Sequence, residues 1–600
     1  MTMPGALNRK PLRLWPGVVL AVLLCFVRFL LPRIAPDEMI YAVLGGLAGG
    51  ILIILWWLLF SRAPWVERVG AIVLMAAGLY VTRYFVDVSI ATGAQRFLFP
   101  FLAIPPLGAA FVAWAVVTRH LSTTVRRASM AATILLACGA WTLVRTGGFT
   151  ASFQNDLHWR WTQTPEERLV AQLAGQPAPV PPPPPAAAET PAAGAPAKPA
   201  QQGPARGLPR IVAEPPARWP GFRGPHRDGV VSGVRINTDW TAAPPTAMWR
   251  RPIGPGWSSF AVRGGLLYTQ EQRGPEEVVS CYRLTTGEPV WAHKDPARFW
   301  ESNGGPGPRS TPTVSNGRVY TMGATGILNA LNANDGSVIW SRNAASDAAM
   351  KLPDWGFASS PLVVDELVIA APSGRLVAYD IGTGAPRWFG PPHGTSYSSP
   401  QMATIGGVPQ ILLLSAAGVT SVELSSGKVL WEHTWKGYPI VQPALTADGN
   451  VLMSVTDSSG IRRIAVAHSA EQWSVEERWT STGLKPYFND FIVHKDHAYG
   501  FDGSILSCID LKDGKRVWKG GRYGNGQLIL LPEQDVLLVL SELGELALVK
   551  ATPDQFTELA RFPALEGKTW NHPVLAGDVL LVRNGEEMAA FRLSTAERAP

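Results

Sequence analysis

The first 150 residues alternate between long apolar stretches and short connections that carry most of the charged side chains. A transmembrane helix needs about 20 mostly apolar residues, whereas a secretory signal would be a single short apolar core. Five stretches of about the required length follow one another, at 14–31, 39–60, 69–90, 97–117 and 128–144. The pattern predicts an all-α bundle of five transmembrane helices.

Basic residues gather in the connections on one side of this expected bundle, and such connections face the cytoplasm. They are Arg9, Lys10, Arg13, Arg62, Arg68, Arg119, Arg126 and Arg127, whereas the opposite side carries Arg33 and Arg96. We therefore expect a cytoplasmic N-terminus and an extracytoplasmic location for everything after Arg145.

Arg83 and Asp87 are the charged pair inside the third stretch. Four residues apart, they are expected to share a helix face and to neutralise each other. Either they snorkel near the outer surface or they form a quinone or proton site.

The chain beyond the bundle changes character twice. Thr164 and Pro165 read as a helix start behind two tryptophans suited to a membrane interface, which predicts a short interfacial helix within 151–175. Residues 176–209 are rich in proline and alanine and are expected to form an extended spacer. The predicted domains are thus the bundle at 1–150, this helix, the linker and a repeat domain at 210–600.

The repeat domain is marked by a column of aromatic residues spaced about 45 residues apart, the length of a four-stranded propeller blade. The tryptophans, which we expect to dock the blades to one another, are Trp249, Trp291, Trp340, Trp388, Trp431, Trp479 and Trp518, and Phe562 takes the eighth place. The pattern predicts an all-β propeller with eight blades.

Five of the repeats align without a gap ahead of the tryptophan and place a glycine four residues before it. The sequence ALNANDGSVIW from Ala330 is typical: a strand, a tight turn with glycine at positive φ, and a second strand. The copies that end at Trp479 and Phe562 lack this glycine. Because the C-terminal strands have no closing aromatic residue and Trp249 has no strands before it, we expect the two ends of the domain to complete one blade together.

Charge restricts the class of partner. Residues 1–209 hold 17 Lys and Arg against 8 Asp and Glu, whereas the remainder holds 36 against 38. The basic excess therefore belongs to the membrane topology, and the near-neutral repeat domain has no electrostatic footprint for nucleic acid.

The repeats resemble the pyrroloquinoline-quinone-like (PQQ-like) propeller family. Tyr379, Asp380, Thr383, Gly384 and Trp388 match its pattern of a small residue, Asp, Thr-Gly and a closing tryptophan. The lead-in also resembles the opening of bacterial members of that family, in the residues Trp219, Pro220, Phe222, Arg223, Gly224, Pro225, Arg227, Asp228 and Gly229.

Two branches of this family have different activities. The resemblance to quinoprotein dehydrogenases implies PQQ and calcium over the propeller axis, and their membrane glucose-oxidising members also have five N-terminal spans. The resemblance to non-enzymatic propellers of the outer-membrane assembly machinery implies a scaffold. This chain departs from both branches, because it has no adjacent cysteine pair and no haem motif, and it also lacks a lipoprotein cysteine near its N-terminus.

A ligand of a propeller would meet the residues that start the innermost strands, because these residues converge on the central channel. The candidates are Trp257, Ser258, Ser259, Arg309, Ser310, Ser359, Ser360, Ser398, Ser399, Gln442, Asn489, Asp490, Asn571 and His572. They could bind a small polar molecule or an Asp490-bound calcium ion, or simply line the channel. No catalytic residue and no metal ligand set is assigned.

We therefore expect a non-catalytic binding or scaffold module on the periplasmic face of the bacterial inner membrane, with a protein or small-molecule ligand. The alternative is a PQQ-dependent dehydrogenase that passes electrons to membrane quinone.

Overall fold

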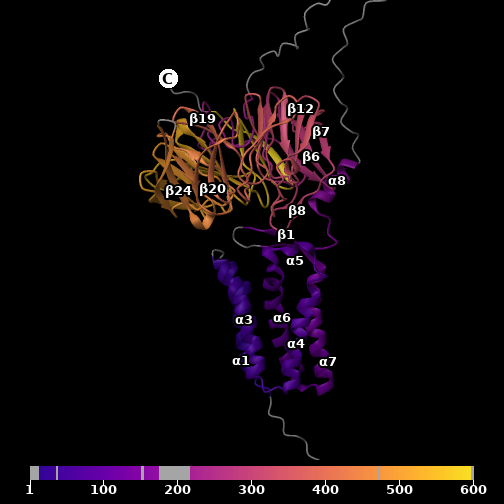
Figure 1. Ribbon diagram of the computed structural model, residues 1–600. Coiled ribbons are helices and arrows are strands. Elements are labelled where there is room, and N and C mark those ends of the chain that lie inside the picture. Colours follow the sequence, from indigo (N-terminus) through magenta and orange to yellow (C-terminus); the bar gives the residue numbers. More distant parts are fainter. Residues whose placement is uncertain (1–11, 36–37, 151–154, 175–216, 470–471, 596–600) are drawn as a thin grey trace, which may run out of the picture. The chain divides into compact units, whose positions relative to one another are not determined.

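The computed structural model describes residues 12–35, 38–150, 155–174, 217–469 and 472–595. The chain divides into two compact units, one of residues 1–164 with Trp300–Gly305, and one of Pro165–Phe299 with Pro306–Pro600. Figure 1 draws the helices of the first unit in indigo and violet and the strands of the second in magenta to yellow. The predicted linker at 176–209 lies outside the described residues.

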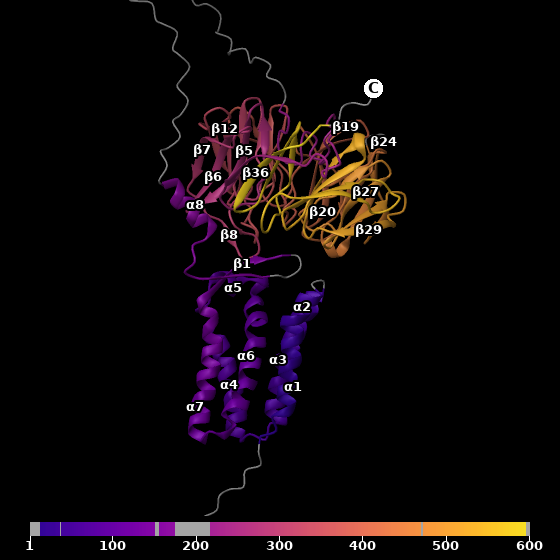
Figure 2. The ribbon, with the colours of Figure 1, turned by 180° about the vertical axis from the view of Figure 1, so that it is seen from behind.

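The first unit is a helical bundle (Figures 1 and 2). Its elements are α1 (Trp15–Cys25), a π-helical turn (Phe26–Leu30), α2 (Leu31–Ile34), α3 (Met39–Leu59), α4 (Trp65–Thr82), α5 (Val88–Thr92), α6 (Leu98–Val117) and α7 (Thr123–Gly139), followed by the hairpin of β1 (Val144–Phe149) and β2 (Asn155–Trp159). Large apolar side chains fill the bundle interior, where the ring of Trp57 meets that of Phe111 edge-on at 4.8 Å.

Four helical segments of the described residues are long and apolar enough to cross a membrane, one fewer than expected. They are Trp15–Ile34, Met39–Leu59, Trp65–Thr82 and Leu98–His120. The fifth place is taken by α7, which has only 17 residues and carries Arg126 and Arg127 near its start. Both arginines form ion pairs with Glu67 of α4, which is 2% exposed, so one end of α7 is polar.

The third expected span is shorter than the apolar stretch because Asp87 begins a new helix. The Asp87 carboxylate accepts a hydrogen bond from the Ser89 N–H at 3.0 Å and caps α5, whereas α4 has already ended at Thr82. Asp87 lies 3.6 Å from the Arg160 guanidinium. The expectation that Arg83 and Asp87 share a helix face was therefore wrong.

The second unit is an eight-bladed propeller of four-stranded antiparallel sheets. Seven blades are continuous in the sequence: β4–β7 (Ala261–Arg263, Leu266–Arg273, Glu276–Arg283, Pro289–Asp295), β10–β13 (Thr313–Ser315, Arg318–Met322, Ile327–Asn332, Val338–Asn343), β14–β17 (Leu362–Val364, Leu367–Ala370, Val377–Asp380, Pro386–Phe389), β18–β21 (Gln401–Ile405, Val408–Ser415, Gly418–Glu423, Val429–Thr434), β22–β25 (Ala444–Leu445, Val451–Met453, Ile461–Ser469, Gln472–Ser481), β26–β29 (Ile492–His494, His497–Asp502, Ile505–Asp510, Arg516–Arg522) and β30–β33 (Gln527–Leu531, Val536–Leu540, Glu545–Lys550, Glu558–Pro563). We number them blades 1 to 7. The two copies without the turn glycine, blades 5 and 7, are complete.

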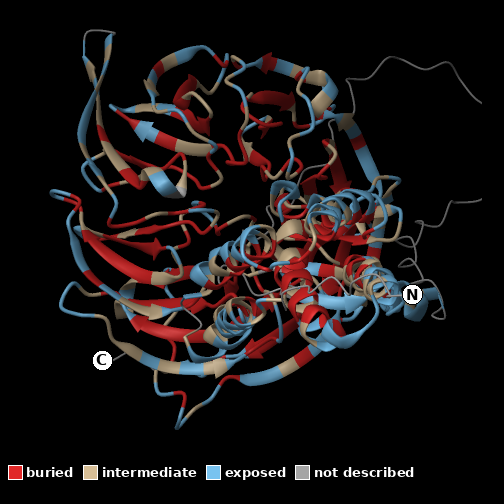
Figure 3. Cartoon of the chain, turned by 90° about the horizontal axis from the view of Figure 1, so that it is seen from below, coloured by how far each residue is buried: buried red, intermediate tan, exposed pale blue. Residues whose placement is uncertain are grey.

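Blade 8 is shared between the two ends of the domain, as the sequence predicted. It contains β34 (Val574–Ala576), β35 (Val579–Arg583), β36 (Glu587–Arg592) and, as its outermost strand, β3 (Thr246–Pro252). Trp249 of β3 pairs with Ala590 of β36. Figure 3 shows buried residues along the blade strands and exposed residues along the outer rim. The innermost strand β30 of blade 7 is wholly buried, whereas the outermost strand β29 of blade 6 is mostly not.

The tryptophan and glycine columns join consecutive blades. The indole N–H of Trp340 donates to the Ile381 carbonyl of the next blade at 3.1 Å, and Gly384 of that blade lies against the same indole, so close that a Cβ there would come within 2.6 Å of the ring. Gly384 also has φ +70°, so this position needs glycine for two reasons. In blade 4, the indole N–H of Trp431 instead donates to the Gln410 side chain of its own blade at 2.6 Å.

A short helix belongs with the propeller. Helix α8 (Pro165–Ala174) places Glu166 in its first turn, and this carboxylate makes two hydrogen bonds to Arg298, at 2.6 and 2.9 Å, and accepts the Gly274 N–H at 2.9 Å. The two units therefore join at Thr164 and Pro165, ahead of the proline-rich linker.

Candidate functional site on the propeller axis

Each blade contributes one residue at the start of its innermost strand, and these eight residues form what we call the axial column. All are at most 8% exposed. In blade order they are Ser259, Thr311, Ser360, Ser399, Gln442, Asp490, Gln527 and His572.

The axial column is tied together by hydrogen bonds that pass from blade to blade. In blades 1 to 5, the main-chain N–H of each column residue donates to the side-chain oxygen of the column residue in the next blade. The distances are 3.0 Å from Ser259 to Thr311, 2.9 Å from Thr311 to Ser360, 2.9 Å from Ser360 to Ser399, 2.6 Å from Ser399 to Gln442 and 2.7 Å from Gln442 to Asp490.

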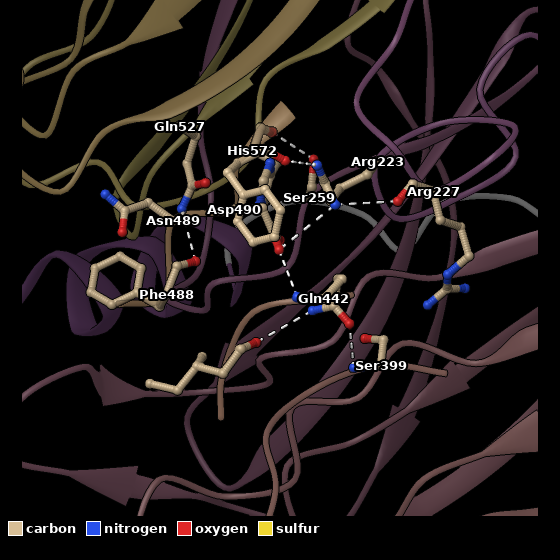
Figure 4. Close-up of polar contacts among 12 residues, drawn as sticks. Arg223, Arg227, Ser259, Ser399, Gln442, Phe488, Asn489, Asp490, Gln527 and His572 are labelled. Carbon is tan, nitrogen blue, oxygen red and sulfur yellow. Dashed lines mark hydrogen bonds and ion pairs between the residues drawn. The ribbon is translucent and has the colours of Figure 1, made fainter. Parts of the chain in front are cut away.

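Two further hydrogen bonds connect blade 7 to blade 8 and blade 1 to blade 8. Gln527 donates to the Trp570 carbonyl at 3.1 Å, and Ser259 donates to the His572 carbonyl at 2.6 Å. Figure 4 shows the column residues Ser259, Ser399, Gln442, Asp490, Gln527 and His572. Many hydrogen-bonding groups of the axial column therefore already have partners in neighbouring blades, and these bonds hold the blades in register.

All fourteen residues singled out from the sequence lie in the axial column or one or two residues before it. Ser310 is not the column residue of blade 2, because Thr311 occupies that place ahead of Pro312, as Ser360 does ahead of Pro361. Arg309 turns back to the Gly307 carbonyl at 3.0 Å and lies over the Phe299 ring. The ring of Trp257 lies against that of Trp570, with centroids 4.8 Å apart and the ring planes tilted by 36°.

Sequence reasoning missed the column residue of blade 7, Gln527. No proline follows it, so it lacks the signal that marks several other inner strands. Its distance from Phe562 is no guide either, because the spacing between column residue and closing aromatic varies from 28 residues in blade 3 to 37 in blade 5.

Sequence reasoning also missed that the lead-in segment supplies two buried arginines to the axis. Arg223, which is 3% exposed, donates to the Phe491 carbonyl of blade 6 at 2.9 Å and lies 3.6 Å from the Asp490 carboxylate. Arg227, which is 6% exposed, donates to the carbonyls of Ser360 and Pro361 in blade 3, each at 2.9 Å. The lead-in therefore binds both blade 3 and blade 6, and Figure 4 shows Arg223 beside Asp490.

Burial controls the charges at this end of the axis. Desolvation, with the nearby Arg223 charge, lowers the pKa of His572 to about 3, so this histidine is neutral and its 3.8 Å contact with Asp490 is not an ion pair. Burial raises the pKa of Asp490, against the opposing effect of Arg223. Burial also lowers the pKa of Arg227 to about 9.

These axial residues do not fit the calcium and quinone pair that the dehydrogenase branch places there. Calcium takes six to eight oxygen ligands, usually including several carboxylates. Asp490 is the one carboxylate of the column, and it already accepts the Gln442 N–H and faces Arg223. Within the described ranges, no group of three or more His, Cys, Asp or Glu side chains is placed to hold a metal ion.

Comparison with known proteins decides the family. The family model described as outer membrane protein assembly factor BamB matches residues 228–409 and 398–526. The chain is a PQQ-like β-propeller repeat protein. The assembly factor BamB of Shewanella oneidensis is 24% identical over 340 residues, which cover 46% of this chain and 80% of that protein. The BamB of Yersinia pestis is 22% identical over 327 residues, which cover 51% of this chain and 70% of that protein.

Solved structures also match this chain, at low sequence identity and with TM-scores below 0.5. BamB from Moraxella catarrhalis has 14% identity and a TM-score of 0.41, over 59% of this chain and 99% of that one. The quinohemoprotein alcohol dehydrogenase from Comamonas testosteroni has 13% identity and a TM-score of 0.49, over 65% and 82%.

In this PQQ-like propeller the axial column and the lead-in arginines together form a structural hub. Arg223 and Arg227 satisfy main-chain carbonyls of blades 3 and 6 that strand pairing leaves available. A charged group in such a place is stable only while its partners remain, which makes the hub sensitive to substitution.

Proposed function

We propose that this chain is a non-catalytic, membrane-anchored PQQ-like propeller that binds a protein partner on the periplasmic side of the inner membrane. The observation that carries the proposal is the axis itself, where the chain's own Arg223 and Arg227 stand in place of a carboxylate set for a metal-bound quinone. The relatives named as outer membrane protein assembly factors support a protein as the partner.

The four apolar helical segments support the anchor, and the excess of basic residues in the connections on one side of the expected bundle supports a periplasmic propeller. In this proposal the partner is a component of the cell envelope. We also propose domain boundaries near residues 150, 175 and 209, with the repeat domain beginning near residue 210.

Partner binding is tested on the tagged full-length protein, crosslinked in intact cells, solubilised and analysed by mass spectrometry. We expect one envelope protein in near-equal amount with the chain, absent when an unrelated membrane protein carries the same tag. In parallel, purified full-length protein is incubated with PQQ and calcium chloride and monitored for cofactor absorbance and for dye reduction with sugars and alcohols. A cofactor spectrum with turnover would overturn the proposal in favour of the dehydrogenase.

The side of the membrane is tested separately by protease digestion of spheroplasts that contain the full chain. The proposal expects loss of the propeller without lysis of the cells. A propeller that is digested only after lysis contradicts the periplasmic location.

A further inference from the structure

A belt of six aromatic side chains leads into the start of the inner strands. We define the aromatic belt as Trp257, Trp355, Tyr397, Tyr487, Phe488 and Trp570. Successive ring centroids are 4.8 Å apart from Trp257 to Trp570, 4.8 Å from Trp570 to Phe488, 5.2 Å from Phe488 to Tyr487, 6.2 Å from Tyr487 to Trp355 and 5.0 Å from Trp355 to Tyr397. Four of these residues stand two places before a column residue, so the belt follows the axis.

Directly behind the belt lie buried amide groups with unused hydrogen-bonding capacity. Asn489 and Asn571 are each 1% exposed and follow Phe488 and Trp570 in the chain, and Gln527 is 2% exposed. The Nδ2 of Asn489, the Oδ1 of Asn571 and the Oε1 of Gln527 have no hydrogen-bond partner within the described residues. Buried polar atoms are rarely left unpaired, so three of them in consecutive blades indicate a place where a polar ligand binds.

The charges beside the belt are balanced. Lys568 places its ammonium 4.5 Å from the centre of the Trp570 ring and 5.4 Å from that of Trp257. The Glu542 carboxylate, which is buried, accepts the Trp570 indole N–H at 2.8 Å. One cation and one anion against the same indole give no preference for a phosphate or a nucleic acid, which require clustered basic side chains.

We propose that the aromatic belt and the amides of Asn489, Gln527 and Asn571 form the binding site for an extended polypeptide segment that carries proline or aromatic residues. Amide side chains offer both donors and acceptors, as the main chain of an extended peptide does. Aromatic-lined surfaces bind proline-rich segments because these segments are already extended and lose little entropy on binding. The inference rests on the proposed function and identifies the element of the partner that the propeller recognises.

Binding is tested with full-length protein in detergent and fluorescein-labelled 12-residue peptides, followed by fluorescence anisotropy. The probes are a peptide of four Pro-Pro-Tyr repeats and a Gly-Ser peptide of equal length, with cellohexaose and inorganic phosphate as unlabelled competitors. We expect saturable binding of the Pro-Pro-Tyr peptide alone and no displacement by the sugar or by phosphate. No binding of this peptide, or its displacement by either competitor, would overturn the peptide assignment.

Two variants locate the site. Phe488→Leu keeps an apolar side chain but removes a ring of the belt, and Asn489→Asp keeps the oxygen that accepts the Tyr487 N–H but removes the unpaired donor. Each should weaken peptide binding about five- to tenfold, the effect of one lost hydrogen bond or ring contact. The matched control is Phe556→Leu in blade 7, where the ring packs on Trp518 away from the belt.

Unchanged affinity in Phe488→Leu, or an equal loss in Phe556→Leu, contradicts the site. The same variants in the crosslinking experiment separate the two proposals. A partner that is still recovered with Phe488→Leu leaves the scaffold function in place and refutes the belt as its binding site, whereas a wild-type chain that recovers no partner refutes the function itself.

Discussion

Small polar side chains at the starts of the inner strands hold the blades together by bonding to the main chain of a neighbour. Ser360 accepts the Thr311 N–H from blade 2 and gives its own N–H to Ser399 of blade 4. A serine at this position therefore replaces the strand partner that an N–H on the innermost edge of a sheet lacks. Runs such as Ser-Ser-Pro are explained by this architecture without a ligand.

Glu277 in β6 is a residue whose charge opposes folding at neutral pH. The side chain is 3% exposed, one carboxylate oxygen accepts the Ala324 N–H at 3.1 Å, and the other is among the buried atoms without a hydrogen-bond partner in the described structure. Desolvation, with the nearby Asp295 carboxylate, raises the pKa of Glu277 from 4.5 to about 7. The folded state therefore binds a proton more tightly than the unfolded state.

Because of this difference, the contribution of Glu277 to stability is complete below pH 4.5 and is lost as the pH rises to 7. The loss amounts to about 3 kcal/mol once the carboxyl is ionised. Glu277→Gln keeps the oxygen that faces Ala324 and cannot ionise, so we expect the variant to be more stable than the wild type at pH 8 and nearly equal at pH 5. Thermal unfolding at both pH values checks this, and an equal difference at pH 5 and pH 8 would contradict it.

At the scale of elements, helix α8 and the lead-in are the two segments that the propeller recruits from outside its repeats. Helix α8 is held by the bidentate ion pair of Glu166 with Arg298, and the lead-in by the carbonyl bonds of its two arginines. Since α8 precedes the linker and packs on the propeller, the proline-rich stretch connects two parts of the same unit. The chain passes from the first unit to the second between Thr164 and Pro165, and it enters and leaves the first unit again at Trp300–Gly305.

Removing the Arg298 side chain should loosen α8 without disturbing the blades. A bidentate, partly buried pair contributes about 1 kcal/mol, so in Arg298→Ala we expect amide exchange within residues 165–174 to become about fivefold faster. Hydrogen exchange with mass spectrometry measures this. Arg561→Ala, which removes ion pairs to Glu545 and Glu558 in blade 7, is the matched control and should leave α8 unchanged. Equal exchange of α8 in the two variants would show that the ion pair does not hold the helix.

At the scale of the whole propeller, the decisive feature is that the ring closes with strands from both ends of the domain. Strand β36 pairs with β3 on one side and with β35 on the other, so the blade shared by the two ends of the domain has all four strands. Each blade has apolar faces that it can bury only against neighbours. Closure therefore couples the stabilities of the eight sheets, so that they behave as one body.

Truncation should expose this dependence. A chain that ends at Gly585 lacks β36 and leaves β3 and β35 with open edges, and we expect it to aggregate or to lose the single cooperative unfolding transition. A chain that ends at Thr595 keeps the whole strand and should unfold like the wild type. Differential scanning calorimetry on the two purified chains, each with its N-terminal helices, distinguishes them. A transition temperature shared by both chains would show that closure does not stabilise the ring.

The sequence by itself determined the features that repeat or that depend on local patterning. The eight blades, the closure through Trp249 and the glycine turns follow from the spacing of the tryptophans, because every repeat must present the same faces to its neighbours. The apolar helices followed from length and composition, although Asp87 and the two arginines of α7 shortened two of them through contacts that lie outside the apolar pattern.

Only the tertiary structure decided what the polar residues of the axis do. Whether Ser360 or Asp490 is available to a ligand depends on which main-chain groups neighbouring blades bring to it, and those groups are 39 or more residues away in the chain. The arginines of the lead-in meet blades more than 130 residues distant, as Arg227 does with Ser360. The one atom of each amide of Asn489, Gln527 and Asn571 that has no hydrogen-bond partner among the described residues became visible only when every other partner on the axis had been placed. Hydrogen bonding among distant segments has no period in the sequence, so patterning predicts the scaffold and three-dimensional packing assigns the site.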